Sequence, residues 1–344
     1  MKGCISKYQR MKILKTSNCW CLIIFAMAFV FTGKLMAQKL NIQNKGMAFQ
    51  VSVDGEGGSS IQMPEEGLWS IATEWENDWP TGWKHAQAKR IDMSGDWKIL
   101  TGTMKLPEGE WHFRDTYRQE DGRVKCVRRF EWKGDKTLDK VTLSVRWKVT
   151  SKDVQAFLPG ILYYGNPSGG KNGANKVPVF HGKPGEAAIF EEHRYPMPFA
   201  ALEWKGNFQY LGAALHTLPS PVPGGNKNDQ WWSLGVQTNA NDTELTLLSG
   251  PITYNGKKSV AKALQKSSLP YSDTYISVPP GTVIEKTFYL ETFQTNGKGT
   301  AFQRPLYTCI DIFKPFYTED LPAYDEIIQS KYKFAKSRWI EGDN

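Results

Sequence analysis

The sequence predicts a mainly β protein, a large antiparallel β-sandwich followed by one C-terminal amphipathic helix. Three observations support this fold class. Short runs of alternating apolar and polar residues fill much of the chain, turn residues separate them at close intervals, and a single helical stripe follows them. Alternation with short turns is typical of antiparallel sheets that bury one face each, and two such sheets stacked together make a sandwich.

The first 37 residues have the pattern of a signal peptide. Basic residues precede an apolar run at 20–31, and small Ala37 precedes Gln38 at the expected cleavage point. The run is shorter than the roughly 20 residues that a membrane-spanning helix needs. This favours cleavage over a membrane anchor, so we expect a secreted or periplasmic protein.

Cleavage would remove most of the net positive charge. The chain has 43 basic and 35 acidic residues; residues 1–37 hold six of the basic ones and no acidic one, which leaves 37 against 35, or +2. A nucleic-acid-binding surface is expected to show clustered Lys and Arg along the sequence. The mature chain has no such run, so nucleic acid is not an expected partner.

The predicted strands are rich in β-branched and aromatic residues and lie at 97–104, 111–117, 124–130, 141–147, 199–202, 208–215, 245–248 and 283–290. Turn signals lie at 120–122, 132–135, 205–207, 254–256 and 279–281. Residues 165–176 and 219–228 are rich in Gly, Asn or Pro and predict two long loops. Such loops are often functional, and Tyr164 adjoins the first, while Trp231 and Trp232 adjoin the second.

From Pro322 onward, apolar residues at three- and four-residue spacing predict an amphipathic helix. Its stripe consists of Tyr324, Ile327, Ile328, Tyr332, Ala335 and Trp339. The sequence shows no comparable helix before it, so we expect the stripe to dock on the sheet or to begin a domain that this chain lacks. The predicted organisation is a signal peptide at 1–37, a β domain at 38–318 and a helical segment at 319–344.

Two cysteines remain after cleavage, each in a strand-like run: Cys126 within 123–132 and Cys309 within 306–313. An oxidising compartment would permit a bridge between them. Two buried free thiols are the alternative, because Cys is often a small core residue and a chain of this length can build a core without disulfides.

Tryptophans interleaved with acids mark residues 74–83, where Trp75, Trp79 and Trp83 occur. The polar neighbours predict a surface segment in which at least one ring is exposed or covers a neighbouring part. A flat ring beside carboxylates and amides suits sugar recognition, although the same composition occurs in protein interfaces. For any single Trp, a place in the core is the alternative.

The densest polar run consists of Glu191, Glu192, His193, Arg194 and Tyr195. The prolines that follow predict extended chain, in which Glu192 and Arg194 would share one face while Glu191 and His193 share the other. Such groups could bind a uronate or a sugar hydroxyl, or transfer a proton. A salt-bridged loop is the equal alternative.

Metal and nucleotide chemistry find little support in the sequence. The mature histidines show no closely spaced ligand pairs, and there is no P-loop, dinucleotide fingerprint or GxSxG motif. His181 and His216 have the pattern of structural residues. No cofactor is predicted, and the alternating acids Glu74, Glu76 and Asp78 leave only a calcium ion open.

The mature chain resembles, as a pattern, secreted bacterial enzymes that join an N-terminal β-supersandwich of the galactose-mutarotase-like kind to an (α/α) toroid. The resemblance rests on the start at Ala37 and Gln38, the long aromatic β region, the helix opening at 321–328 and the tail at 337–344. It implies a substrate-cleft domain of a polysaccharide-degrading glycoside hydrolase or lyase, with a poly- or oligosaccharide as partner. The toroid would carry most of the active site, and the chain would then be a truncated form. Glu341 and Asp343 would be candidates only in a complete toroid.

Three functions are therefore expected as alternatives. The first is the N-terminal part of a glycoside hydrolase or polysaccharide lyase, whose catalytic residues stay unassigned. The second is a carbohydrate-binding module with exposed rings at Trp231, Trp232 or 75–83. The third is a mutarotase-like isomerase, in which His193 or His216 would face Glu203 or Glu285. The predicted substrate-binding residues are Glu191, Glu192, His193, Arg194, Tyr195, Tyr164, Trp231 and Trp232.

Overall fold

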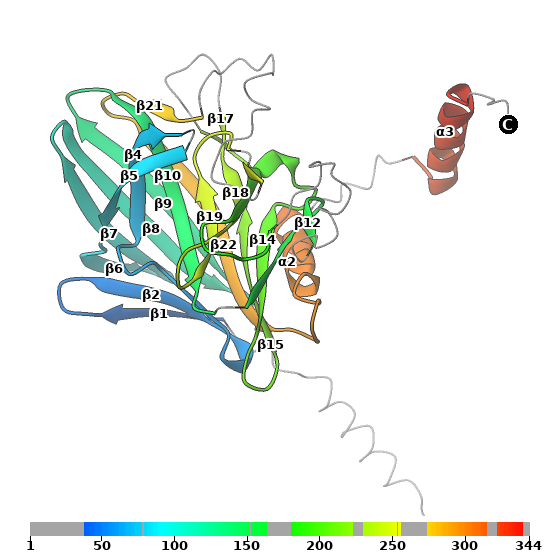
Figure 1. Cartoon of the computed structure of the whole chain (residues 1–344), viewed down its shortest axis with the longest axis horizontal. Coiled ribbons are helices and arrows are strands. Elements are labelled where there is room, and N and C mark those ends of the chain that lie inside the picture. The colour runs from blue at the N-terminus through cyan, green and yellow to red at the C-terminus, as the bar shows by residue number, and fades with distance from the viewer. Residues whose placement is uncertain are drawn as a thin grey trace, which may run out of the picture.

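A computed structural model describes residues 38–77, 79–151, 153–163, 180–222, 230–252, 254–255, 274–314 and 322–339. The predicted signal peptide, the 165–176 loop and Tyr164 lie outside these ranges. Two large antiparallel sheets form the described part, as Figure 1 shows. The predicted mainly β fold is confirmed, and every strand predicted before residue 291 forms, with boundaries that differ by a few residues.

The larger sheet has eleven strands within the described residues. Its main path runs β1 (Lys39–Asn44), β2 (Phe49–Asp54), β3 (Ser60–Gln62), β10 (Leu138–Val149), β19 (Thr243–Leu248), β18 (Ser233–Thr238), β13 (Ala187–Glu191) and β20 (Tyr254–Asn255). Strands β4 (Trp69–Glu76) and β21 (Ile276–Val278) also pair with β10, and β5 (Trp79–Ala86) pairs with β4. A 3₁₀ turn, η1 (Glu56–Gly58), joins β2 to β3.

The second sheet has nine strands within the described residues. Their order is β12 (Leu162–Tyr163), β11 (Val154–Leu158), β14 (Phe199–Lys205), β15 (Tyr210–Thr217), β22 (Val283–Gln294), β9 (Arg123–Gly134), β8 (Gly109–Glu120), β7 (Trp97–Leu106) and β6 (Arg90–Ser94). A small separate ribbon pairs β16 (Pro221–Val222) with β17 (Gln230–Trp231). The long β7, β8 and β9 form two successive hairpins, and the second turns at Gly122, whose φ of 72° is costly for other residues.

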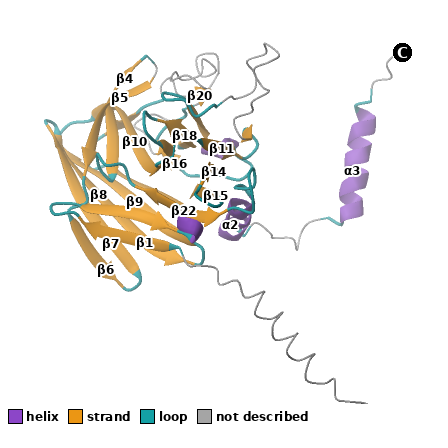
Figure 2. Ribbon diagram, turned by 60° about the horizontal axis from the view of Figure 1, so that its bottom comes forward, coloured by secondary structure: helices purple, strands orange, loops and turns teal. Residues whose placement is uncertain are grey.

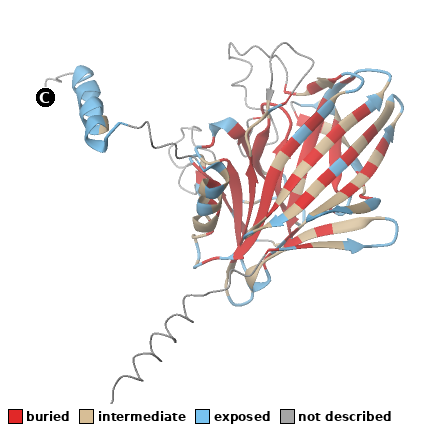
Figure 3. Cartoon of the chain, turned by 180° about the vertical axis from the view of Figure 1, so that it is seen from behind, coloured by how far each residue is buried: buried red, intermediate tan, exposed pale blue. Residues whose placement is uncertain are grey.

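The main core lies between the two sheets. Alternate residues of β8 and β9 enter it, and Figure 3 shows this alternation as bands of buried and more exposed residues along the strands. Aromatic pairs fill the space: the Trp69 ring stacks on Phe113 with centroids 5.3 Å apart, and Trp111 lies 5.4 Å from Trp132. Most of the buried Trp residues are therefore core residues.

A helix that the sequence analysis did not predict packs beside the nine-stranded sheet. It is α2 (Gln303–Phe313), seen next to β15 and β22 in Figure 2. The expectation of a strand at 306–313 was wrong, as was the view that only one helix occurs. Its β-branched and aromatic residues suit a strand in isolation, but Pro305 is tolerated in the first turn of a helix and the apolar side lies on a second core cluster. That cluster consists of Phe157, Phe199, Ala201, Ala214, Phe293, Ala301 and Cys309.

The predicted C-terminal helix is confirmed as α3 (Tyr324–Ser337), but it buries none of its residues. Tyr324, Ile328, Tyr332 and Trp339 are all exposed. Docking of the stripe on a sheet was the first of the two expected outcomes, and it does not occur. Whether it begins a further domain, and whether a boundary lies near residue 318, stay predictions.

Cys126 and Cys309 are free and buried, so the free-thiol alternative is confirmed. Burial raises the pKa of Cys309 to about 12 and that of Cys126 well above its ordinary value. We expect both to resist iodoacetamide at pH 8, where a pKa of about 12 leaves only about one Cys309 thiol in ten thousand ionised. Peptide mapping by mass spectrometry, with and without denaturant, checks this. Rapid native labelling of Cys309 would show instead that α2 detaches readily from the sheet.

Candidate functional site

The predicted polar run at 191–195 forms a salt-bridged turn rather than extended chain. Strand β13 ends at Glu191, and a 3₁₀ turn, η2 (Glu192–Arg194), follows. The turn brings Arg194 Nε within 2.6 Å of Glu191 Oε2, and His193 Nε2 lies 3.5 Å from the same oxygen. The predicted division into alternate faces was therefore wrong, and the equal alternative of a salt-bridged loop is confirmed.

Glu192 points into the protein interior and has no exposed surface. Its carboxylate accepts hydrogen bonds from Lys286 Nζ at 2.6 and 2.9 Å, from Thr217 Oγ1 at 2.7 Å and from the Ser220 amide at 2.7 Å. Burial raises the pKa of Glu192, and nearby Lys286 opposes this shift. Tyr195 is also buried and donates its hydroxyl to the Leu234 carbonyl at 2.5 Å. Both residues hold the loop to the sheets and offer no surface to a ligand.

The two neighbouring tryptophans differ in their surroundings. Trp232 is completely buried, with Lys286 Nζ 5.5 Å from its ring centre. A buried ring cannot stack on a sugar, which corrects the expectation of an exposed Trp232. Trp231 is half-buried and its ring lies 5.3 Å from that of exposed His193. Of the predicted residues that the structure describes, His193, Arg194 and Trp231 are those that remain accessible.

The tryptophans at 75–83 cover a neighbouring part, as predicted. Strands β4 and β5 form a hairpin in which Trp79 is buried, while Trp75 and Trp83 pack on a cluster with Ile189 and Leu248. Within the described ranges, no group of three or more His, Cys, Asp or Glu side chains could hold a metal ion. Asp78, one of the three acids considered for calcium, lies outside those ranges.

The residues considered for an isomerase do not face one another across a cleft. His216 Nε2 lies 2.7 Å from Glu291 Oε1 instead, and both side chains are fully buried. Thr308 of α2 donates to Glu291 at 3.0 Å, which places this couple under the helix. Glu203 accepts the backbone amides of 299–301 just before α2, and Glu285 is exposed beside Arg129. The couple therefore anchors α2 to the sheet.

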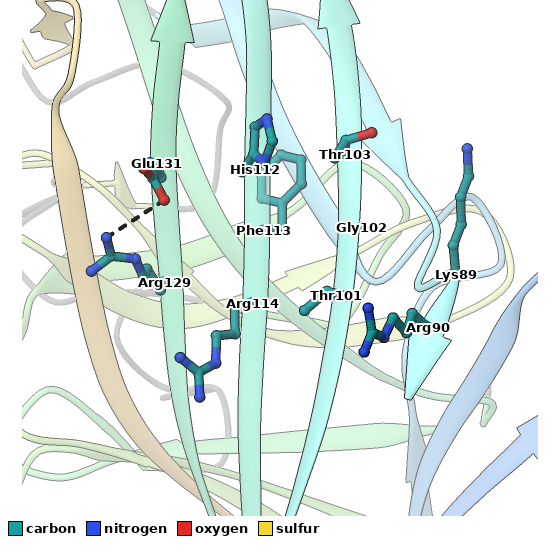
Figure 4. Close-up of a pocket in the computed structure, with 10 residues that line it drawn as sticks. All are labelled: Lys89, Arg90, Thr101, Gly102, Thr103, His112, Phe113, Arg114, Arg129 and Glu131. Carbon is teal, nitrogen blue, oxygen red and sulfur yellow. Dashed lines mark hydrogen bonds and ion pairs between the residues drawn. The ribbon is translucent and has the colours of Figure 1, made fainter. Parts of the chain in front are cut away.

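A hollow of about 540 Å³ lies on the face of the nine-stranded sheet that points away from the core, across β6 to β9 (Figure 4). Its polar lining comes from these strands and from the residue just before β6. It consists of Lys89, Arg90, Thr101, Thr103, His112, Arg114, Arg129 and Glu131. These residues were not predicted. The sequence shows that alternate residues of each strand are polar, but not which strands lie side by side.

The strand register sets the polar side chains in two rows. In the first row Arg90 lies opposite Thr101, Thr101 opposite Arg114, and Arg114 opposite Arg129. The second row consists of Thr103, His112 and Glu131. Directly opposed side chains in an antiparallel pair have Cβ atoms about 5 Å apart. One ligand can therefore contact several strands at once.

Positive charge dominates the hollow. Arg90 pairs with Asp92 at 2.8 Å, and the ion pairs that Arg129 makes among the described residues are both long, 3.5 Å to Glu131 and 3.4 Å to Glu285. Arg114 is exposed, and within the described part of the chain its guanidinium forms no hydrogen bond or ion pair with another side chain. On its other side Arg129 faces Glu285, whereas Arg114 faces the uncharged Thr101. The like-charge pair is therefore compensated on the Arg129 side alone, which is unfavourable for the sheet itself.

Comparison with known proteins finds similarity at the level of solved structures. No protein-family model and no curated protein matches the chain. A galactose mutarotase-like protein from Clostridium acetobutylicum matches at 5% identity and a TM-score of 0.36, over 75% of this chain and 99% of its own. A galactose mutarotase-like protein from Lactobacillus casei matches at 10% identity and a TM-score of 0.32, over 74% of this chain and 100% of its own.

A larger enzyme also matches in part. It is a variant of the GH36 α-galactosidase AgaA from Geobacillus stearothermophilus in complex with stachyose, at 11% identity and a TM-score of 0.37. The match covers 78% of this chain and 43% of the enzyme. These are galactose mutarotase-like proteins and a glycoside hydrolase, in agreement with the β-sandwich part of the resemblance. At such TM-scores the superpositions carry no argument about activity. Neither described α-helix has the length and apolar character required to cross a membrane.

Proposed function

We propose that this chain works outside the cytoplasm as the glycan-binding β-sandwich of a polysaccharide-degrading glycoside hydrolase or lyase. The hollow on β6 to β9 holds the sugar chain. The observation that carries this proposal is the pair of cross-strand rows, which present hydroxyl, imidazole, guanidinium and carboxylate groups on one open surface. Sugar hydroxyls both donate and accept hydrogen bonds, and charged partners strengthen these bonds.

The rigidity of the supporting strands also suits binding. The polar lining residues of β8 alternate with residues fixed in the core, since Phe113 and Asp115 flank Arg114 and both are buried. The long hairpins fix the backbone under the hollow through a continuous antiparallel ladder. A surface that is already in place loses little conformational entropy when a ligand binds.

The lining favours binding over hydrolysis by this chain alone. Most glycoside hydrolases use two carboxyl groups on opposite sides of the scissile bond. Among the described residues that line the hollow, Glu131 supplies the one carboxylate. Catalysis by the complete enzyme would then need a second group from elsewhere.

A second candidate surface is the accessible trio of His193, Arg194 and Trp231. The half-buried Trp231 ring beside an imidazole favours the alternative of a carbohydrate-binding module that uses stacking. Because the trio comes from η2 and β17 and the hollow from β6 to β9, separate variants distinguish the two surfaces.

We test both surfaces by calorimetric titration with a panel of neutral and acidic oligosaccharides. Thr103→Val/His112→Ala is expected to weaken binding about 10-fold or more, since two hydrogen-bonding groups are lost. Trp231→Ala and the exposed Lys205→Ala serve as comparisons and should retain the wild-type affinity. Loss of binding only in Trp231→Ala would move the site to the trio. Absence of binding to every oligosaccharide would refute the proposed function.

A further inference from the structure

We infer that the hollow selects an anionic sugar residue, whose carboxylate or sulfate ester is held between Arg114 and Arg129. This inference rests on the proposed glycan-binding function and names the class of its ligand. In the unliganded protein, two like charges lie close together and destabilise the sheet. Arg114 on β8 lies directly opposite Arg129 on β9, and like charges at opposed positions destabilise a sheet.

The neighbouring acids do not remove this cost. Glu131 and Glu285 both approach Arg129, at 3.5 and 3.4 Å, but neither forms an ion pair with Arg114. Lys89 and Arg90 add two more cations at the other side of the hollow. The lining itself holds four cations and one carboxylate, and Asp92 and Glu285 beside it pair with Arg90 and Arg129. Among the described residues Arg114 has no acidic partner, so an anion placed between the two arginines would offset their repulsion.

The chemistry of guanidinium groups restricts the class of ligand that this site can select. A planar guanidinium binds carboxylate and sulfate oxygens through two parallel hydrogen bonds, a geometry that a neutral hydroxyl cannot match. Thr101, Thr103 and His112 lie beside the arginines and suit the hydroxyls of the same sugar. A single-stranded nucleic acid would additionally need exposed rings on which its bases stack. Phe113, the one ring that lines the hollow apart from His112, is buried.

The test compares oligosaccharides of equal length in three forms: neutral, carboxylated and sulfated. We titrate them into the purified full chain, with a single-stranded oligonucleotide as a fourth ligand. An acidic form should bind about 10- to 100-fold more tightly than the neutral one. Arg114→Ala should abolish this preference, so that the acidic form binds no more tightly than the neutral one. The preference should also fall between low and physiological salt, because the hollow is open to solvent.

Two controls separate a binding role from a structural one. Arg114→Thr removes the like-charge pair and introduces a good strand former. It should lose the preference for the acidic form while its melting temperature stays the same or rises. Lys205→Ala removes an exposed cation from another part of the same sheet and should keep the preference.

Each outcome has a distinct meaning. Whichever acidic form binds more tightly identifies the anion as carboxylate or sulfate. Equal affinity for neutral and acidic forms would overturn this inference and leave the proposed glycan binding intact. Tighter binding of the oligonucleotide than of any sugar, or an unchanged preference in Arg114→Ala, would overturn it as well. Absence of binding to all ligands would overturn the inference and the proposed function together.

Discussion

Replacement of Asp115 with alanine is expected to lower the free energy of unfolding by about 3–5 kcal/mol. Asp115 and Arg128 are fully buried and form a bidentate ion pair. Arg128 Nε lies 2.9 Å from Asp115 Oδ1, and Arg128 Nη2 lies 2.7 Å from Asp115 Oδ2. Removing the carboxylate leaves the Arg128 charge in the core without its counterion. The loss is measured by chemical denaturation.

The pair belongs to a network that joins the two sheets. From the eleven-stranded sheet, Trp69 Nε1 donates to Asp115 at 2.8 Å and the Ser144 carbonyl accepts from Arg128 at 3.1 Å. Tyr117 donates its hydroxyl to Asp115 at 2.6 Å, and burial beside this carboxylate raises the pKa of Tyr117 well above its ordinary value. One substitution therefore removes the partner of three side chains.

The matched control is the double variant Asp115→Leu/Arg128→Met, which replaces both charges by apolar groups of similar size. Buried ion pairs replaced in this way often cost little stability. The double variant should therefore be more stable than Asp115→Ala. A single variant that unfolds at the wild-type denaturant concentration would show that water reaches Arg128.

Replacement of Lys286 with methionine should have an effect of similar size, a loss of about 3–5 kcal/mol in the free energy of unfolding. Lys286 is fully buried on β22 and is the counterion of Glu192. Without it, a carboxylate stays in the core, and among the described residues Thr217 and the Ser220 amide are the donors that remain. Glu285→Gln, at the exposed neighbouring position, is the matched control and should change stability by under about 1 kcal/mol.

The Lys286–Glu192 pair should also make the free energy of unfolding depend on pH. Burial lowers the pKa of Lys286 in the folded protein to about 8, from an ordinary 10.5. Between these values the unfolded chain holds a proton that the folded protein has released, so the wild-type free energy of unfolding should rise with pH. Denaturation curves from pH 7 to 10, compared with Lys286→Met/Glu192→Gln, check the slope. Identical slopes would show that Lys286 titrates normally.

Sequence alternation was sufficient to predict eight of the strands and the sandwich, because a half-buried strand leaves a period of two in its own residues. The same alternation contained a signal that was not used. Arg128 has the phase of Cys126 and Phe130, and Lys286 has that of Ile284 and Phe288, all of them core residues. A charged residue in an apolar phase indicates a buried ion pair, although its partner depends on contacts between sheets.

The candidate site was less accessible to sequence reasoning. The row that contains Arg114 and Arg129 exists because β8 and β9 pair in one register, and a shift by a single residue would break it. The sequence analysis selected 191–195 instead, because polar residues are dense there. In the structure Glu191 pairs with Arg194, and Glu192 pairs with Lys286. Helix α2 was missed because residues 306–313 favour a strand locally and only their packing on the sheet decides otherwise.

The strict alternation along β8 and β9 has an evolutionary consequence. Neighbouring residues of one strand serve two independent purposes, since Asp115 secures the interior while Arg114 meets the solvent. Substitutions at the outward positions can therefore alter which ligands are recognised without disturbing the interior. Selection can then diversify the specificity of this surface while the fold that carries it is inherited unchanged.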